Sequence, residues 1–151
     1  NMNKIYMTWE NFDSDIKKFI DFITLNDFMK DSVILALKRG GFASAIALSN
    51  KTGIPVSTVT YQTRDGNDSV PNFLEPDLIK NAKKIIIPDD IYDTGLTVEN
   101  TVAELVNKFE VPIENIAGLF HYVSDNLTKT ELKLVKYMRH NDGRWVRFPW
   151  E

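Results

Sequence analysis

The residues best suited to chemistry gather in the segment 85–97, which reads IIIPDDIYDTGLT. It carries three carboxylates, then two threonines and a glycine: Asp89, Asp90, Asp93, Thr94, Gly95 and Thr97. Carboxylates accept hydrogen bonds, so an adjacent pair suits sugar hydroxyls, directly or through a metal ion. Threonine hydroxyls and a glycine at a helix start suit a phosphate, because the first N–H groups of a helix lack partners and its dipole is positive there. We therefore expect this segment to bind a sugar phosphate.

Two other interpretations of the segment remain open. In the first, the acidic pair is a solvated strand end, and Asp93-Thr94-Gly95 is an ordinary turn and helix cap. In the second, the carboxylates form a receiver-type acidic pocket that accepts a phosphoryl group. Receiver domains place such a pair after the first strand, whereas this pair follows the third predicted strand.

The surrounding sequence predicts strands that alternate with helices and position this segment. Short apolar runs predict strands at 33–37, 56–61, 84–88, 116–122 and 132–138. Helical spacing of apolar residues predicts helices at 9–25, 42–51 and 97–109. Three of the strands are apolar throughout, which indicates a mainly parallel sheet covered by helices on both faces. Thr8 is expected to cap the first helix. Ligands of such sheets bind beyond the carboxyl ends of the strands, where 85–97 would lie.

Composition and charge limit the function classes. The chain has 151 residues, of which 43% are hydrophobic and 26% are charged, as expected for one globular α/β domain over 1–151. The net charge of -3 argues against nucleic acid as the main partner. The absence of cysteine excludes disulfides, cysteine nucleophiles and cysteine-based zinc sites. No apolar run approaches the roughly 20 residues of a membrane helix, and no signal peptide is evident, so we expect a cytoplasmic protein without stable membrane insertion.

The whole of segment 85–97 resembles the signature of type I phosphoribosyltransferases. That signature has four apolar residues, two acidic residues, and then four residues leading into Thr-Gly-x-Thr. Two positions depart from it: Pro88 stands where a branched apolar residue is usual, and Leu96 where a second glycine is common. Neither departure removes a contacting group. The resemblance extends over most of the chain and is closest to the xanthine-guanine and hypoxanthine branch, which implies that family's single-domain fold.

Three further segments carry the resemblance. Lys38, Arg39, Gly40 and Gly41 resemble the pyrophosphate loop, which implies a cis peptide bond between Arg39 and Gly40; a plain strand-to-helix turn is the alternative. Segment 62–81 stands where the family has a flexible hood, and Arg64 and Lys80 are either phosphate contacts or solvated residues. Segment 144–151 resembles the C-terminal base-binding element.

The tail and the fourth strand bear on base recognition. The resemblance implies that Trp145 stacks on the purine and that Val146 meets the base through its backbone, whereas Trp150 is expected to pack. The family usually has a lysine at the end of the fourth strand, where it donates to the 6-oxo group. This chain has Tyr122 nearest that place and His121 beside it. Either side chain could donate to an oxo group with less charge, although His121 could equally be structural.

The resemblance implies an Mg²⁺-dependent enzyme that joins a 6-oxopurine to 5-phospho-α-D-ribose 1-diphosphate (PRPP). Asp89 and Asp90 would hold the ribose hydroxyls and Mg²⁺, directly or through water, and Asp93 would accept a proton near N7 of the base. The 5'-phosphate would contact Asp93, Thr94, Gly95, Leu96 and Thr97. The pyrophosphate would contact 38–41 and Arg64. The family is usually dimeric or tetrameric. There are two alternatives: a non-catalytic sensor of PRPP or a nucleotide, and an enzyme of the same class that acts on another base.

Overall fold

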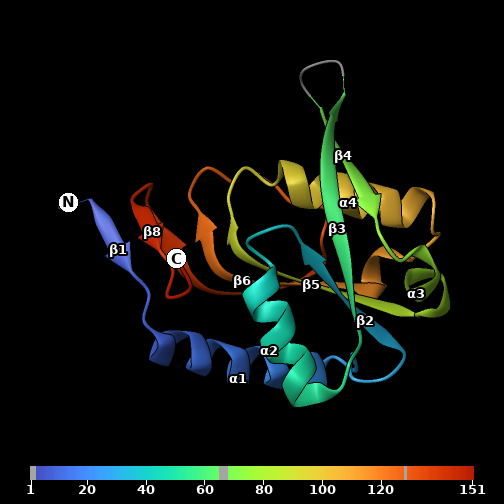
Figure 1. Cartoon of the computed structure of the whole chain (residues 1–151), viewed down its shortest axis with the longest axis horizontal. Coiled ribbons are helices and arrows are strands. Elements are labelled where there is room, and N and C mark those ends of the chain that lie inside the picture. The colour runs from blue at the N-terminus through green and yellow to red at the C-terminus, as the bar shows by residue number, and fades with distance from the viewer. Residues whose placement is uncertain (1–2, 65–67, 128) are drawn as a thin grey trace.

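The computed structural model describes residues 3–64, 68–127 and 129–151 (Figure 1). Its strands are β1 (Lys4–Tyr6), β2 (Ser32–Leu37), β3 (Val56–Arg64), β4 (Asp68–Phe73), β5 (Lys84–Tyr92), β6 (Ile116–Ser124), β7 (Leu134–Asn141) and β8 (Trp145–Arg147). Its helices are α1 (Trp9–Leu25), α2 (Phe42–Thr52), α3 (Pro76–Asn81) and α4 (Leu96–Asn107), with one 3₁₀ turn, η1 (Ile113–Asn115). None of the described helices is long and apolar enough to cross a membrane.

The main sheet has six strands in the order β4-β3-β2-β5-β6-β7. All neighbours pair parallel except β3 and β4, so the predicted, mainly parallel α/β sheet is confirmed. From β2 the chain moves to β3 on one side, while β5 lies on the other side of β2. The strand order therefore reverses between β2 and β5, and the loops after these two strands flank the crevice where such sheets bind ligands.

The apolar strands are buried on both faces. Along β2, Ile34 and Ala36 join the core cluster beneath α1 and α2, while Val33, Leu35 and Leu37 join the cluster beneath α3 and α4. Figure 1 shows α1 and α2 below the sheet and α4 above it. Because successive side chains of a strand point to opposite faces, a strand covered on both faces must be apolar at every position.

The first helix begins where the sequence predicts. Thr8 Oγ1 accepts a hydrogen bond from the Asn11 N–H at 3.1 Å, and Asn11 Oδ1 accepts one from the Thr8 N–H at 3.1 Å. This reciprocal pair forms a capping box that satisfies two N–H groups at the start of α1.

The predicted loop over 62–81 is more structured than expected. β3 continues to Arg64 and pairs antiparallel with β4, and α3 follows. Figure 1 shows this hairpin projecting from the body of the sheet. Pro71 removes one donor from β4, which is tolerated because β4 is the edge strand. Residues 65–67 lie outside the described part, and the hood role of 62–81 stays a prediction.

The tail also forms an element that the sequence pattern did not predict. β8 pairs parallel with β1 in a separate two-stranded sheet, with Ile5 opposite Val146. Val146 and Phe148 are buried in the cluster beneath α1, so the tail is held in place from both sides. This pairing fixes the backbone of Trp145 beside the carboxyl ends of β6 and β7.

Candidate sugar-phosphate and base site

The acidic pair lies at the carboxyl end of β5. The strand runs four residues beyond the predicted 84–88, so Asp89 and Asp90 still belong to β5, and Asp89 pairs with Phe120 of β6. Asp89 Oδ1 accepts a hydrogen bond from the Asp90 N–H at 2.8 Å, and Asp90 Oδ1 accepts one from the Ile91 N–H at 2.6 Å. Burial, and then the neighbouring charge of Asp90, raise the pKa of Asp89 well above its usual value. A proton, a cation or a hydroxyl donor would each relieve this repulsion.

A cavity of about 240 Å³ opens beside this pair. The end of β5 and the start of α4 contribute all of Asp89 to Val98, and the loop after β2 contributes Lys38 and Gly40. Gly95 precedes α4 with φ 87°, a left-handed conformation that favours glycine. The N-cap residue Gly95 has no side chain to cap α4, and the Leu96 N–H donates only a long hydrogen bond of 3.4 Å to the Thr94 hydroxyl. The start of α4 lines this cavity, and a helix N-terminus is suited to a phosphate. The predicted phosphate residues Asp93 to Thr97 therefore meet in one place.

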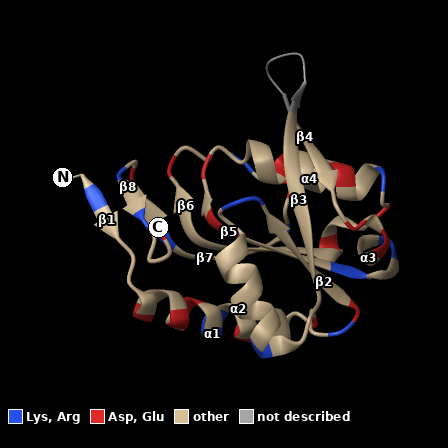
Figure 2. Cartoon of the chain, in the orientation of Figure 1, with Lys and Arg blue, Asp and Glu red and all other residues tan. Residues whose placement is uncertain are grey.

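The predicted pyrophosphate loop packs directly on the acidic strand end. A Cβ built on Gly40 would lie 2.5 Å from Asp90 Oδ2, and one built on Gly41 would lie 2.8 Å from the Pro88 carbonyl oxygen. Backbone atoms of Pro88 and Leu37 therefore require glycine at position 41, whereas a side chain at position 40 would have to displace the Asp90 carboxylate. The exposed Lys38 lines the cavity, and Figure 2 shows the basic loop between β2 and α2 beside the acidic end of β5.

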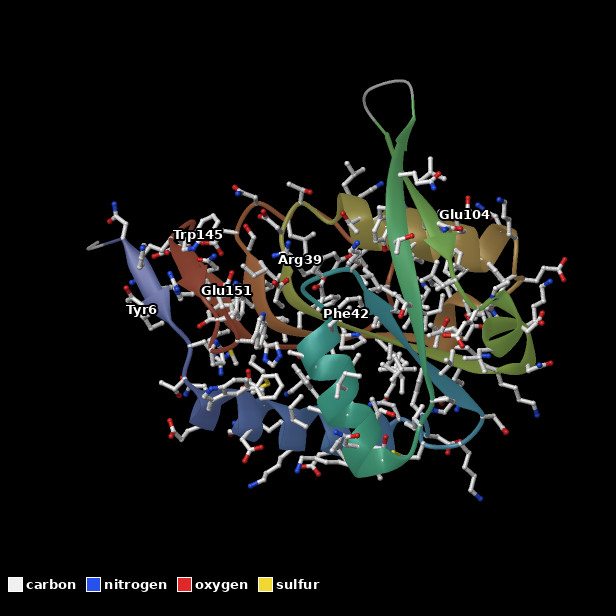
Figure 3. All side chains as sticks on the ribbon, viewed as in Figure 1. Tyr6, Arg39, Phe42, Glu104, Trp145 and Glu151 are labelled. Atoms are coloured by element: carbon white, nitrogen blue, oxygen red, sulfur yellow. The ribbon has the colours of Figure 1, made fainter. Side chains whose placement is uncertain are left out.

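The cis peptide bond among the described residues is Lys38–Arg39, one position before the predicted Arg39–Gly40 bond. The residue types of 38–41 do not by themselves specify which peptide bond of this loop is cis. Arg39 is exposed and lies in the loop between β2 and α2, as Figure 3 shows, but it is not among the residues that line the cavity.

A second cavity of about 320 Å³ adjoins the first. Its walls come from the ends of β5, β6 and β7 and from the tail: Asp90, Ile91, Asp93, Ser124, Asn126, Asn141, Gly143, Arg144, Trp145, Val146, Phe148 and Glu151. Trp145 is 67% exposed, so its ring offers a free apolar face, and Figure 3 shows it at the same end of the molecule as Glu151. Asp90, Ile91 and Asp93 line both cavities. The exposed Asp93 thus lies where the contents of the two cavities would meet.

His121 and Tyr122 do not line either cavity, contrary to their predicted role as base contacts. His121 is fully buried between Asp15 and Ser44. Tyr122 is 3% exposed, and its ring packs against Phe148. Both residues lie within β6 and not at its end, because the strand continues to Ser124, two residues beyond its predicted end.

The side chains that β6 and its following turn present to the second cavity are Ser124 and Asn126. Sequence reasoning missed these two residues, together with Asn141 and Glu151. The available signal was a run of polar residues directly after the apolar part of each strand, at 124–126 and 140–142.

Three further predicted residues have different outcomes. Lys80 is exposed on α3 and lines neither cavity. The side chain of Arg64 lies outside the described part, although its backbone ends β3. Trp150 stacks on Phe148, with ring centroids 4.9 Å apart and an interplanar angle of 12°, which confirms its predicted packing role.

The donor set at the site fits Mg²⁺ held mainly by ligand oxygens. Among the described residues there is no group of three or more metal-ligating side chains. Asp89 and Asp90 supply two adjacent carboxylates, and the raised pKa of Asp89 indicates that a cation would be favoured there. Mg²⁺ at phosphate sites is commonly bound through one or two carboxylates together with substrate oxygens and water.

Comparisons with known proteins agree with this geometry. The family profile described as phosphoribosyl transferase domain matches residues 2–151. A purine phosphoribosyltransferase structure from Pyrococcus horikoshii OT3 is 26% identical, with a TM-score of 0.70, over 99% of this chain and 94% of that chain. The xanthine-guanine-hypoxanthine phosphoribosyltransferase of Helicobacter pylori is 17% identical, with a TM-score of 0.79, over 98% and 94%.

A hypothetical protein from Neisseria gonorrhoeae with bound ppGpp is 19% identical, with a TM-score of 0.72, over 98% of this chain and 89% of that chain. A search of curated proteins gave no significant match. The profile match spans nearly the whole chain, and the sheet, the acidic strand end and the glycine-led helix agree with the resemblance seen in 85–97. The chain belongs to the phosphoribosyl transferase domain family, and purine phosphoribosyltransferases are among its structural relatives.

Proposed function

We propose that this protein is a purine phosphoribosyltransferase that transfers the 5-phosphoribosyl group of PRPP to a 6-oxopurine, giving a nucleoside 5'-monophosphate and pyrophosphate. One observation carries the proposal: a cavity suited to a sugar phosphate and a cavity suited to a flat base share the wall formed by Asp90, Ile91 and Asp93. A product with a base joined to ribose 5-phosphate would extend across that wall.

In this proposal, different residues contact different parts of PRPP. Thr94, Gly95, Leu96 and Thr97 hold the 5'-phosphate at the start of α4, and the loop 38–41 holds the pyrophosphate. Asp89 and Asp90 bind the ribose hydroxyls and would hold Mg²⁺, which neutralises charge on the leaving pyrophosphate. The bond from ribose C1 to the pyrophosphate oxygen breaks as the bond to the base nitrogen forms.

Charge stabilisation is central because positive charge develops at ribose C1 while the leaving group departs. The carboxylates at the shared wall lie where that positive charge would develop. Asp93 accepts the proton that the base loses near N7. Trp145 stacks on the base, Val146 offers its backbone, and the Ser124 hydroxyl and Asn126 amide are neutral donors for the 6-oxo group.

The direct test incubates the protein with PRPP, Mg²⁺ and one base at a time, and measures pyrophosphate release. We expect turnover with at least one of guanine, hypoxanthine and xanthine; no turnover with any of them would refute the proposal. Asp93→Asn should reduce kcat while PRPP binding is retained. Asp13→Asn, an exposed carboxylate on α1 outside both cavities, is the matched control and should leave kcat unchanged.

A second candidate is a sensor that binds PRPP or a guanine nucleotide without turnover. The Neisseria gonorrhoeae relative with bound ppGpp favours this candidate. Titration of PRPP and of ppGpp by calorimetry distinguishes the two functions. Binding of either ligand, together with no pyrophosphate release for any purine, would support the sensor and exclude the enzyme.

A further inference from the structure

Four side chains far apart in the sequence form a buried polar network beneath the site. His121 Nδ1 lies 2.6 Å from Asp15 Oδ2, and His121 Nε2 lies 2.6 Å from Ser44 Oγ. Arg139 donates to both oxygens of Asp15, at 2.8 and 2.7 Å, and to the His121 carbonyl at 3.3 Å. Asp15, Ser44 and His121 are at most 1% exposed.

The protonation of this network follows from its charges. Burial alone would raise the pKa of Asp15, but hydrogen bonds from His121 and Arg139 outweigh it and hold that pKa below its usual value. Asp15 is therefore a carboxylate, which favours a proton on His121 Nδ1. In the neutral ring His121 Nε2 is then an acceptor, and the Ser44 hydroxyl donates to it.

The atom order Ser44 Oγ, His121 Nε2, His121 Nδ1 and Asp15 Oδ2 is that of a serine hydrolase triad. Burial excludes that use, because Ser44 and His121 are 0% exposed and no substrate carbonyl can reach the hydroxyl. Arg139 also engages both carboxylate oxygens. Neither cavity of the proposed site includes Ser44, His121 or Asp15. The network therefore has a role other than nucleophilic catalysis.

One arm of the network leads to the pyrophosphate loop. Ser44 lies in the first turn of α2, which begins at Phe42 directly after Gly41. The Phe42 N–H donates to the Arg39 carbonyl, and the Ala45 N–H donates to the Gly41 carbonyl. The Ser44 hydroxyl thus fixes the turn from which the loop 38–41 departs. Gly41 serves as the N-cap of α2 without any side-chain cap, so a buried bond from Ser44 supplies an anchor that a cap would otherwise give.

The other arm leads to the base cavity. His121 lies on β6, three positions before Ser124, and Arg139 lies on β7, two positions before Asn141. Ser124 and Asn141 line the second cavity. The network therefore joins α2, which follows the pyrophosphate loop, to β6 and β7, the two strands that end at the second cavity. Asp15 of α1 contacts both His121 of β6 and Arg139 of β7.

We propose that Ser44 and His121 are positioning residues, which hold the pyrophosphate loop in its binding geometry relative to the base-binding strand ends. This inference rests on the proposed function, since it concerns the pyrophosphate half of the PRPP site. The residues act through the backbone of α2 and do not touch substrate. The loop's own amides and Lys38 make the contacts.

The test is the smallest change, Ser44→Ala, with Ser57→Ala as its matched control. Both serines are 0% exposed, but Ser57 Oγ has no hydrogen-bond partner among the described residues. We expect the Kd of PRPP with Mg²⁺, measured by calorimetry, to rise about three- to tenfold in Ser44→Ala, the range corresponding to one lost hydrogen bond, and to stay unchanged in Ser57→Ala. Ribose 5-phosphate lacks the pyrophosphate, so its Kd should not change in either variant.

A purely structural role would weaken PRPP and ribose 5-phosphate equally or leave both unchanged, and either result would overturn the inference. His121→Asn provides a second check, because its amide can still donate to Asp15 but cannot reach Ser44. We expect His121→Asn to weaken PRPP binding as Ser44→Ala does, and the double variant to add no further loss. Additive losses would contradict a shared bond. If the wild-type protein bound no PRPP at all, the proposed function itself would be refuted.

Discussion

Gly40→Ala tests how closely the pyrophosphate loop and the acidic strand end depend on each other. A Cβ at residue 40 would lie 2.5 Å from Asp90 Oδ2 and 2.6 Å from Asp90 Cγ and Oδ1. Ordinary van der Waals contacts begin near 3.4 Å, so the carboxylate must move by roughly 1 Å. That movement would break its 2.6 Å hydrogen bond from the Ile91 N–H.

The magnitude follows from these losses. A hydrogen bond to a charged group contributes about 1.5–3 kcal/mol, and added steric strain costs about 1–3 kcal/mol. Gly40 has no positive φ, so alanine is compatible with its backbone, and loss of unfolded-chain entropy would return about 0.4–1 kcal/mol. We expect Gly40→Ala to lower the free energy of unfolding by about 2–5 kcal/mol. We also expect it to weaken PRPP binding at least tenfold, because Asp90 would be displaced from its proposed position at the ribose.

The control is the same substitution in an Asp90→Ala background. Without the carboxylate the clash is gone, so Gly40→Ala should be neutral or stabilising by up to about 1 kcal/mol. Urea unfolding of the four proteins of this cycle measures the coupling, and calorimetry with PRPP measures the binding. An equal cost of Gly40→Ala in both backgrounds would refute the reasoning, because the clash with Asp90 would then not be its cause.

Three further variants test the charges and the base cavity. Because burial and Asp90 raise the pKa of Asp89, the wild-type free energy of unfolding should fall as pH rises above about 4. Asp89→Asn should flatten that slope in urea unfolding, raise the free energy of unfolding at pH 7, and abolish PRPP binding. An unchanged slope would contradict the burial of this charge. Because the pKa of Asp15 is lowered, the stability that the Asp15 carboxylate contributes is present above about pH 4 and is lost on acidification. Asp15→Asn should lower the free energy of unfolding by about 2–3 kcal/mol at pH 7 in urea unfolding and should reduce its loss at acidic pH. An unchanged loss of stability at acidic pH would contradict this role of Asp15. Trp145→Ala should raise KM for the base about ten- to a hundredfold, because it removes a stacking face. The free energy of unfolding should stay within about 0.5 kcal/mol of the wild-type value, because the ring is 67% exposed. An unchanged KM would exclude stacking.

Much of the fold could be predicted because its signals are local. The apolar runs of β2, β5 and β6, the helical spacing of α1 and α4, and the cap at Thr8 each depend on neighbouring residues. The hairpin of β3 and β4 and the pairing of β1 with β8 could not be predicted in the same way. Backbone hydrogen bonds between distant or irregular segments hold these strands, and the sequence pattern of 62–81 carries Pro and Gly that favour loops.

The sequence by itself determined the proposed sugar-phosphate half of the site, because Asp89 to Thr97 is one continuous segment whose strand, turn and helix start are encoded in order. Only the tertiary structure decided the proposed base half, the second cavity, which is assembled from the ends of three strands and the tail. The tertiary structure also determined that His121 is buried and hydrogen-bonded, which the local sequence could not distinguish from a ligand-binding histidine. Its partners Asp15 and Ser44 lie 106 and 77 residues away, and they become neighbours only when α1 and α2 pack on the same face of the sheet.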